Sequence, residues 1–234
     1  MKQSTSRLVL FDVDGTMLDS RGAIVTAMAA AFIRCQLTPP PPPKILAKIG
    51  LSLHDMVTAL AEGHRDVPVS RIVAAYQDAY FSPQLLRSAN DLRFPGLAAM
   101  LEHVNTPDTI MGIVTGRSRR SLDYAFETQQ LDPYFPIHIT ADDGPSKPAG
   151  DLVMIAMAEA GVTPEQTVMV GDTTFDILMA HAASVPAIGV AWGYHGKDAL
   201  KALGVPVASS MYHLPGVIET IRPTEKYKSP AAVL

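Results

Sequence analysis

Short apolar runs that alternate with helix-like stretches are the feature that most restricts the fold of this chain. The runs cover residues 8–11, 110–114, 137–139, 168–170 and 187–190. Such runs are typical of strands buried on both faces of a parallel sheet. Helix-like stretches lie between them at residues 118–130, 150–160 and 174–183. The alternation predicts an α/β fold whose core is a Rossmann-like, doubly wound parallel sheet.

Residues 20–92 interrupt this alternation. Amphipathic patterns cover residues 23–33, 53–62 and 72–81, and no run in the interval resembles a strand. We therefore expect an all-helical domain inserted between the first two core strands. The sequence predicts a core at residues 1–19 and 93–222, a helical domain at residues 20–92 and a tail with little pattern at residues 223–234.

Five consecutive prolines occupy residues 39–43, inside the helical insert. We expect them to form a rigid linker, because proline cannot continue a helix and both flanks have helical patterns. A docking peptide for an aromatic groove is the alternative interpretation.

Composition restricts the class of protein. The 234 residues suffice for one α/β core and a small second domain. A formal net charge of −4 gives no overall attraction for nucleic acid. Cys35 is the only cysteine, so an internal disulfide is impossible, and no apolar run is long enough to span a bilayer. We expect a cytoplasmic protein without nucleic-acid or membrane partners. The sequence does not distinguish a monomer from a dimer.

The first chemical motif is Asp12-Val13-Asp14-Gly15-Thr16, directly after the first apolar run. Residues two apart along a strand face the same way, so Asp12 and Asp14 can address one site past the strand end. Open parallel sheets bind ligands at that edge. Two adjacent carboxylates repel each other unless a cation or a shared proton resolves the conflict.

Two further motifs follow the next two runs. Thr115-Gly116-Arg117-Ser118 offers a hydroxyl, a glycine and a new helix N-terminus, which together can cradle an anion. Taken alone, such a motif is more often a helix cap than a phosphate site. Lys147 lies in a loop after the third run and can neutralise a phosphate or hold a carboxylate in place. Taken alone, a lysine in a loop is usually solvated.

The fourth motif follows residues 168–170. Asp172 leaves the strand and Asp176 lies four residues later, so both can face one cleft at a helix start. A simple N-cap role for Asp172 is the alternative. Because all four motifs follow core strands, they should meet at one edge of one sheet. Carboxylates and a lysine around an anion cradle fit Mg²⁺ and a phosphoryl group.

Together, DVDGT, VTGRS, the lysine of SKP and GDTTFD resemble, in order, the four motifs of the haloacid dehalogenase superfamily. The helical insert resembles the type C1 cap of that superfamily. The resemblance is strongest to its subfamily IA, the phosphoglycolate-phosphatase-like branch, and covers about residues 7–221. One departure is Gly150, where such enzymes commonly have proline; it leaves Lys147 and Asp151 in place.

The resemblance implies a role for each motif residue. Asp12 would be the nucleophile and a Mg²⁺ ligand. Asp14 would be the general acid and base, with its backbone carbonyl on the metal. Thr115, Gly116 and Lys147 would bind the transferring phosphoryl group. In the fourth motif, Asp172 would ligate the metal, and Asp176 would support the site without ligating the metal itself.

Specificity candidates come from the cap and the second motif. Lys48-Ile49-Gly50-Leu51 resembles the specificity loop of the cap, and His54 lies close to it. Arg117, Arg119 and Arg120 form a basic cluster that either attracts an anionic substrate or lies on a solvated helix face.

The resemblance implies a Mg²⁺-dependent phosphatase that hydrolyses small phosphorylated metabolites, with phosphoglycolate as one candidate, through a phospho-aspartate. Asp14 disfavours the dehalogenases and phosphonate hydrolases of the superfamily, which lack this carboxylate. The segment 18–22 has no histidine, which disfavours sugar phosphomutase activity. The alternatives are a nucleotidase or pyrophosphatase on the same core, or a non-catalytic regulatory or binding protein on a phosphatase scaffold.

Overall fold

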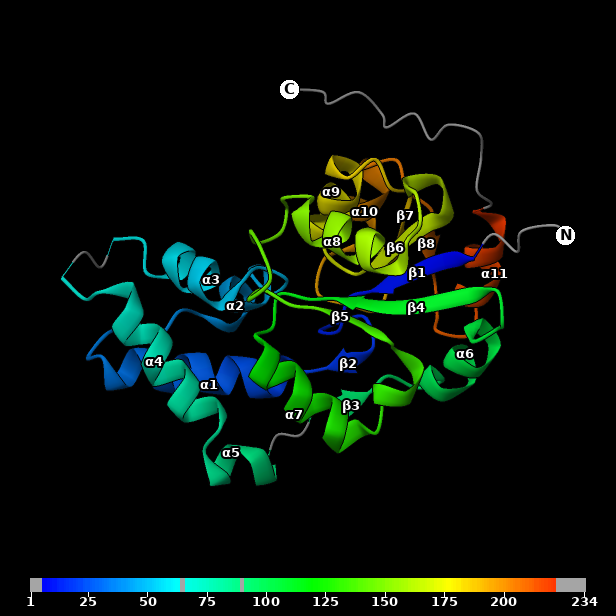
Figure 1. Cartoon of the computed structure of the whole chain (residues 1–234). Coiled ribbons are helices and arrows are strands. Elements are labelled where there is room, and N and C mark those ends of the chain that lie inside the picture. Colours follow the sequence, from blue (N-terminus) through cyan, green and yellow to red (C-terminus); the bar gives the residue numbers. More distant parts are fainter. Residues whose placement is uncertain (1–5, 64–65, 89–90, 222–234) are drawn as a thin grey trace, which may run out of the picture.

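The computed structural model of the chain describes residues 6–63, 66–88 and 91–221, so the predicted tail at residues 223–234 lies outside the described part. Six parallel strands form the central sheet in the order β5-β4-β1-β6-β7-β8 (Figure 1). The strands are β1 (Arg7–Phe11), β4 (Thr109–Val114), β5 (Ile137–Ile139), β6 (Thr167–Gly171), β7 (Ala187–Val190) and β8 (Val207–Ala208). All five predicted strands are therefore confirmed, and β8 adds a short sixth.

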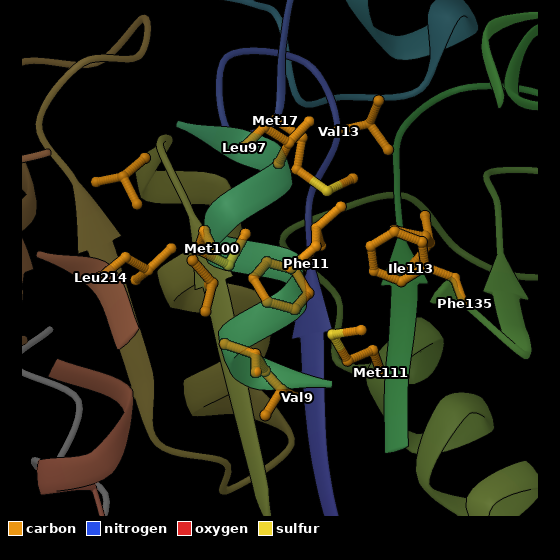
Figure 2. Packing of buried hydrophobic residues seen from close by; sticks show 14 of the residues in the cluster. Val9, Phe11, Val13, Met17, Leu97, Met100, Met111, Ile113, Phe135 and Leu214 are labelled. Atoms are coloured by element: carbon orange, nitrogen blue, oxygen red, sulfur yellow. The ribbon is translucent and has the colours of Figure 1, made fainter. Parts of the chain in front are cut away.

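Successive side chains of β1 point to opposite faces of the sheet, and each face packs against its own layer of helices. Val9 and Phe11 belong to one hydrophobic cluster, whereas Leu8 and Leu10 belong to the other. Figure 2 shows Phe11 packed among residues of the first cluster, including Met100. That cluster includes α6 (Leu97–Val104), α7 (Arg119–Gln129) and α11 (Leu214–Thr220). The opposite layer contains α8 (Asp151–Ala160), α9 (Thr174–Ala182) and α10 (Lys197–Ala202).

The helical insert has a hydrophobic core of its own. Met28, Phe32, Ile45 and Ile72 are fully buried in a cluster separate from those of the sheet. The insert lies to one side of the sheet in Figure 1. Its helices are α1 (Arg21–Arg34), α2 (Pro42–Leu46), α3 (Leu53–Leu60), α4 (Val69–Tyr80) and α5 (Pro83–Ser88). This confirms the predicted α/β core with an inserted helical domain.

A two-stranded antiparallel ribbon joins insert and core. β2 (Leu18–Asp19) pairs with β3 (Leu92–Arg93), with Leu18 opposite Arg93 and Asp19 opposite Leu92. The expectation that residues 20–92 contain no strand is therefore wrong at Leu92. Two residues are too few for an alternating pattern to be visible in the sequence. Because the ribbon holds both connections, we propose it as the boundary between the two domains.

The proline run is only partly a linker. Pro41 is extended, with φ −63° and ψ 146°, but Pro42 and Pro43 form the start of α2. Proline suits the first turn of a helix because the N–H groups there have no partner within the helix. The linker prediction is therefore wrong for the last two prolines.

Among the described residues, no helix is both long and apolar enough to cross a membrane.

Candidate active site

Three adjacent strands deliver the first site residues to one edge of the sheet. Asp12 follows β1, Thr115 follows β4 and Asp172 follows β6. In the ladder, Phe11 is level with Ile113 of β4 and with Val170 of β6, so these strands end together. The three site residues are buried, with at most 1% of their surface exposed. The predicted convergence of the motifs on one sheet edge is therefore present.

Lys147 connects the first motif to the fourth. Its Nζ donates to Asp12 Oδ1 at 2.6 Å and to Asp176 Oδ1 at 2.5 Å. Burial lowers the pKa of Lys147, but the two carboxylates outweigh it and raise the pKa above its usual value. The lysine is therefore a permanent cation in the site, not a solvated loop residue.

Asp172 is held by groups from two other loops. Its Oδ1 accepts from Thr16 Oγ1 at 3.0 Å, and its Oδ2 accepts from the Tyr194 backbone N–H at 2.7 Å. A Cβ on Gly15, where φ is +87°, or on Gly193 would collide with this carboxylate. The glycine after the second aspartate of DVDGT is thus required both by its backbone angle and by the close approach of Asp172.

Asp176 has both carboxylate oxygens engaged. Oδ1 accepts from Lys147, and Oδ2 accepts from the backbone N–H of Thr173 at 3.0 Å and from its Oγ1 at 2.7 Å. These contacts form a capping box at the start of α9. Asp176 therefore orients Lys147 and has little capacity left for another ligand.

The residues present fit a divalent cation. Carboxylate oxygens of Asp12, Asp172 and Asp176 lie within 4.8 Å of one another. The ammonium group of Lys147 contacts Asp12 and Asp176, whereas Asp172 accepts only from a hydroxyl and a backbone N–H. Asp12 Oδ2 is buried without a hydrogen-bond partner. Burial raises the pKa of Asp12 to about 7 despite Lys147, and burial together with Asp12 and Asp176 raises the pKa of Asp172. A hard cation would offset this excess of carboxylate.

Arg117 makes contacts that its position in the sequence does not reveal. Its Nη2 pairs with Asp14 Oδ1 at 2.5 Å and with Asp91 Oδ2 at 2.6 Å, and its Nε donates to Asp14 Oδ2 at 2.9 Å. It also donates to Ser20 Oγ at 2.8 Å and to the Tyr80 hydroxyl at 3.2 Å. The alternative of a solvated helix face is wrong for Arg117, which is buried and precedes α7.

The other two arginines of the cluster have different surroundings. Arg119 pairs with Asp143 at 2.7 Å on a part-exposed surface. Arg120 is exposed and lies over the ring of Phe81 at 4.1 Å from its centroid. The predicted cluster is therefore dispersed, and Asp91, Ser20 and Tyr80 are the partners that sequence reasoning missed. Nothing in their local sequence marks them, because all are more than 25 residues from Arg117.

The cap loop touches core loops on both sides of the site. A Cβ on Gly116 would lie 2.5 Å from the carbonyl oxygen of Leu51 and 2.6 Å from that of Gly50. Gly50 itself lies against Thr173, and the Ser52 backbone N–H donates to Ser146 Oγ at 2.8 Å. The insert therefore covers the site through its loop.

Two specificity candidates lie elsewhere. Lys48 is half-buried and His54 has 69% of its side chain exposed; neither lines the pocket above the site. Gly50 and Arg117 do line it, together with Asp12, Asp14 and Gly116. The roles assigned to these residues remain predictions.

Comparison with known proteins identifies the family. The model of the haloacid dehalogenase-like hydrolases matches residues 9–190, so the chain belongs to this family. The resemblance found in the four motifs is thereby confirmed.

Relatives of similar length carry phosphatase names. The chain is 36% identical to "Probable phosphatase IndB" of Dickeya dadantii over 83% of this chain and 85% of that protein. It is 32% identical to phosphoglycolate phosphatase of Pseudomonas putida, over 82% of this chain and 72% of that protein. It is 29% identical to pyrophosphatase PpaX of Bacillus pumilus, over 86% of this chain and 90% of that protein. The crystal structure of a predicted phosphatase from Clostridium acetobutylicum has the same fold, with a TM-score of 0.80 at 21% identity. The match covers 92% of this chain and 99% of that one.

Proposed function

We propose that the chain is a Mg²⁺-dependent phosphatase that hydrolyses small phosphate monoesters through a phospho-aspartate on Asp12. The observation that carries this proposal is the state of the Asp12 carboxylate. One oxygen is fixed by Lys147, and the other is buried and has no hydrogen-bond partner. An oxygen held in this way has no protein hydrogen bond to break before it attacks a phosphorus atom brought next to it. Family membership and the names of the relatives support the reaction class.

In the first step, Asp12 Oδ2 attacks phosphorus. Lys147, the Thr115 hydroxyl and the backbone N–H of Gly116 bind the phosphoryl oxygens and stabilise their charge. The bond from phosphorus to the leaving oxygen breaks, and its electron pair goes to that oxygen. Asp14 donates a proton there, so the leaving group departs as an alcohol.

In the second step, a water molecule attacks the phosphorus of the phospho-aspartate. Asp14, now a carboxylate, accepts a proton from this water. The bond from phosphorus to Asp12 breaks, and phosphate and the free carboxylate are released. Arg117 contacts both oxygens of Asp14 and fixes the orientation of this side chain. One of these two contacts must open for Asp14 to carry the proton.

Asp12 and Asp172 would hold the Mg²⁺ ion with the main-chain carbonyl of Asp14, an assignment that rests on the family resemblance. When bound, the ion supplies positive charge against the phosphoryl group and the clustered carboxylates. Asp176 acts through Lys147, because its own oxygens are already engaged.

The covering loop of the insert favours small substrates, since a macromolecule cannot enter beneath it. Phosphoglycolate is one candidate, because a relative carries that name. Pyrophosphate is the rival, because another relative is named a pyrophosphatase. A purely regulatory role is disfavoured by the complete set of Asp12, Lys147 and Asp172 in contact geometry.

The proposal predicts Mg²⁺-dependent release of phosphate from p-nitrophenyl phosphate. EDTA should abolish this release, and added Mg²⁺ should restore it. Asp12→Asn should lower kcat by at least about 10³-fold, because the amide cannot form the acyl phosphate. The measurement is steady-state release of nitrophenol by both proteins, with circular dichroism to show that the variant is folded. Full activity of Asp12→Asn would contradict the assignment of Asp12 as the nucleophile.

A further inference from the structure

The pocket above Asp12 and Asp14 has an apolar wall formed by the insert. Its cavity volume is about 70 Å³, and the space around this cavity continues into open solvent. The wall is built from α1, α3, α4 and the segments next to them, and includes Ile24, Leu51, Leu53, Met56, Tyr76 and Phe81. Asp12 and Gly116 line the pocket from the core side, so the leaving group of an ester bound at Asp12 must face this wall.

The pocket offers no available cation for a charged leaving group. Arg117 is the only basic residue among the described residues that line it. Its guanidinium already serves the carboxylates of Asp14 and Asp91. A carboxylate or phosphate on the leaving group would be buried near acidic side chains without a counter-ion, which is costly.

Aromatic rings form one part of the wall. Tyr76 and Tyr80 stack with their centroids 5.7 Å apart, and Phe81 meets Tyr80 edge-on at 5.3 Å. Rings held in this way offer a rigid apolar surface with a hydroxyl at one end, against which another flat ring can pack. The wall thus matches the shape and polarity of a ring that carries no charge.

Building on the phosphatase activity proposed above, we propose that the physiological substrate is the phosphate monoester of an uncharged alcohol with an aromatic or similarly bulky ring. Esters whose leaving group is anionic, such as phosphoglycolate and pyrophosphate, are poor substrates. The pocket wall and the engaged Arg117 set this preference.

A matched pair of esters tests the charge preference. Benzyl phosphate and 4-carboxybenzyl phosphate have the same ring and the same type of leaving alcohol, and differ in one carboxylate. With Mg²⁺ present, kcat/KM for benzyl phosphate should exceed that for 4-carboxybenzyl phosphate and for phosphoglycolate by at least about tenfold. Equal values, or a preference for either carboxylated ester, would overturn the inference.

Leu53→Lys tests whether this wall is responsible. Leu53 is half-buried at the start of α3 and lines the pocket, so a lysine there brings a cation to the leaving group at modest cost to folding. The ratio of kcat/KM for the benzyl over the carboxybenzyl ester should fall by at least about tenfold in Leu53→Lys. Leu53→Met is the matched control and should keep the wild-type ratio. An unchanged ratio in Leu53→Lys would also overturn the inference.

The two proposals fail in different ways. If the wild-type protein hydrolyses the carboxylated esters better and Asp12→Asn abolishes that activity, the phosphatase proposal stands and only the leaving-group inference falls. If the wild-type protein hydrolyses none of the esters, including p-nitrophenyl phosphate, both fall.

Discussion

Asp12 and Asp14 are separated by one residue, yet each carboxylate contacts a different cation. Asp12 pairs with Lys147 from the loop after β5, whereas Asp14 pairs with Arg117 from the loop after β4. Lys147 also contacts Asp176 of the core, whereas Arg117 also donates to the hydroxyl of Tyr80 in the insert. The proposed nucleophile is thus anchored in the core alone, and the proposed acid and base is anchored at the junction of core and insert.

Apart from the proposed catalytic and metal-binding residues, the residue that should matter most for stability is Arg117. Replacing it by methionine would leave Asp14 and Asp91 buried without their counter-ion. We expect Arg117→Met to lower the free energy of unfolding by about 3–5 kcal/mol, as for other broken buried pairs. Urea denaturation monitored by circular dichroism measures the change.

Arg120→Met is the matched control. It makes the same chemical change three residues further on, where the side chain is exposed and contacts the face of Phe81. Its loss should stay below about 1 kcal/mol. Equal losses in the two variants would contradict the assigned network.

Residue patterns were sufficient to predict the motif part of the site. The aspartates, Thr115 and Lys147 follow core strands, and parallel strands bring such positions together whatever the details of packing. Asp91 could not be predicted in the same way, since its contact with Arg117 depends on how the insert returns to the core. Thr16 and Tyr194 were missed as partners of Asp172 because single hydrogen bonds across 156 and 22 residues leave no periodic signal.

At the level of elements, the loop before α3 and the loop after β4 are in tight contact. The carbonyl oxygens of Gly50 and Leu51 face Gly116, which leaves no room for a Cβ. Closure of the insert over the site therefore depends on a glycine in the second motif as well as on the sequence of the cap loop.

Gly116→Ala should push these two loops apart. The new methyl group meets backbone oxygens at 2.5 and 2.6 Å, which cannot move aside as a flexible side chain can. We expect kcat/KM for p-nitrophenyl phosphate to fall at least about tenfold and the free energy of unfolding to fall by about 1–3 kcal/mol. Steady-state kinetics and urea denaturation give the two quantities.

Gly22→Ala serves as the control for this substitution. Gly22 lies in α1, and nothing lies within 4 Å of a Cβ placed there. Activity should remain at the wild-type level, and stability should stay the same or rise by up to about 1 kcal/mol. If Gly116→Ala behaves like Gly22→Ala, the loops are not in the contact described.

The helices and strands differed in how well the sequence pattern predicted them. α3, α4 and the long core strands have clear apolar periodicity, and their positions were predicted to within a few residues. β2, β3 and β8 have two residues each, too few to show a period. The start of α2 was hidden by prolines, because a helix-breaking residue is also a good first residue of a helix.

At the scale of the whole molecule, the α/β core and the helical insert line one pocket between them. The core contributes the groups suited to phosphoryl transfer, and the insert contributes an apolar wall. The parallel sheet was predicted from the alternation of apolar runs and helix-like stretches, and the helical insert from the interruption of this alternation. The order of the strands in the sheet was not predicted. The character of the pocket did not, because it depends on which faces of α1, α3 and α4 turn toward the core.

The identity of the nucleophile is the central claim, and direct capture of the phosphorylated side chain tests it. The protein would be incubated with p-nitrophenyl phosphate and Mg²⁺, quenched in acid and treated with borohydride, which reduces an acyl phosphate to an alcohol. Mass spectrometry of the peptide that spans residues 8–21 should then show homoserine at position 12, and Asp12→Asn should show none. Reduction at Asp14 or Asp172 instead, or no reduced residue while turnover proceeds in the untreated sample, would contradict the account.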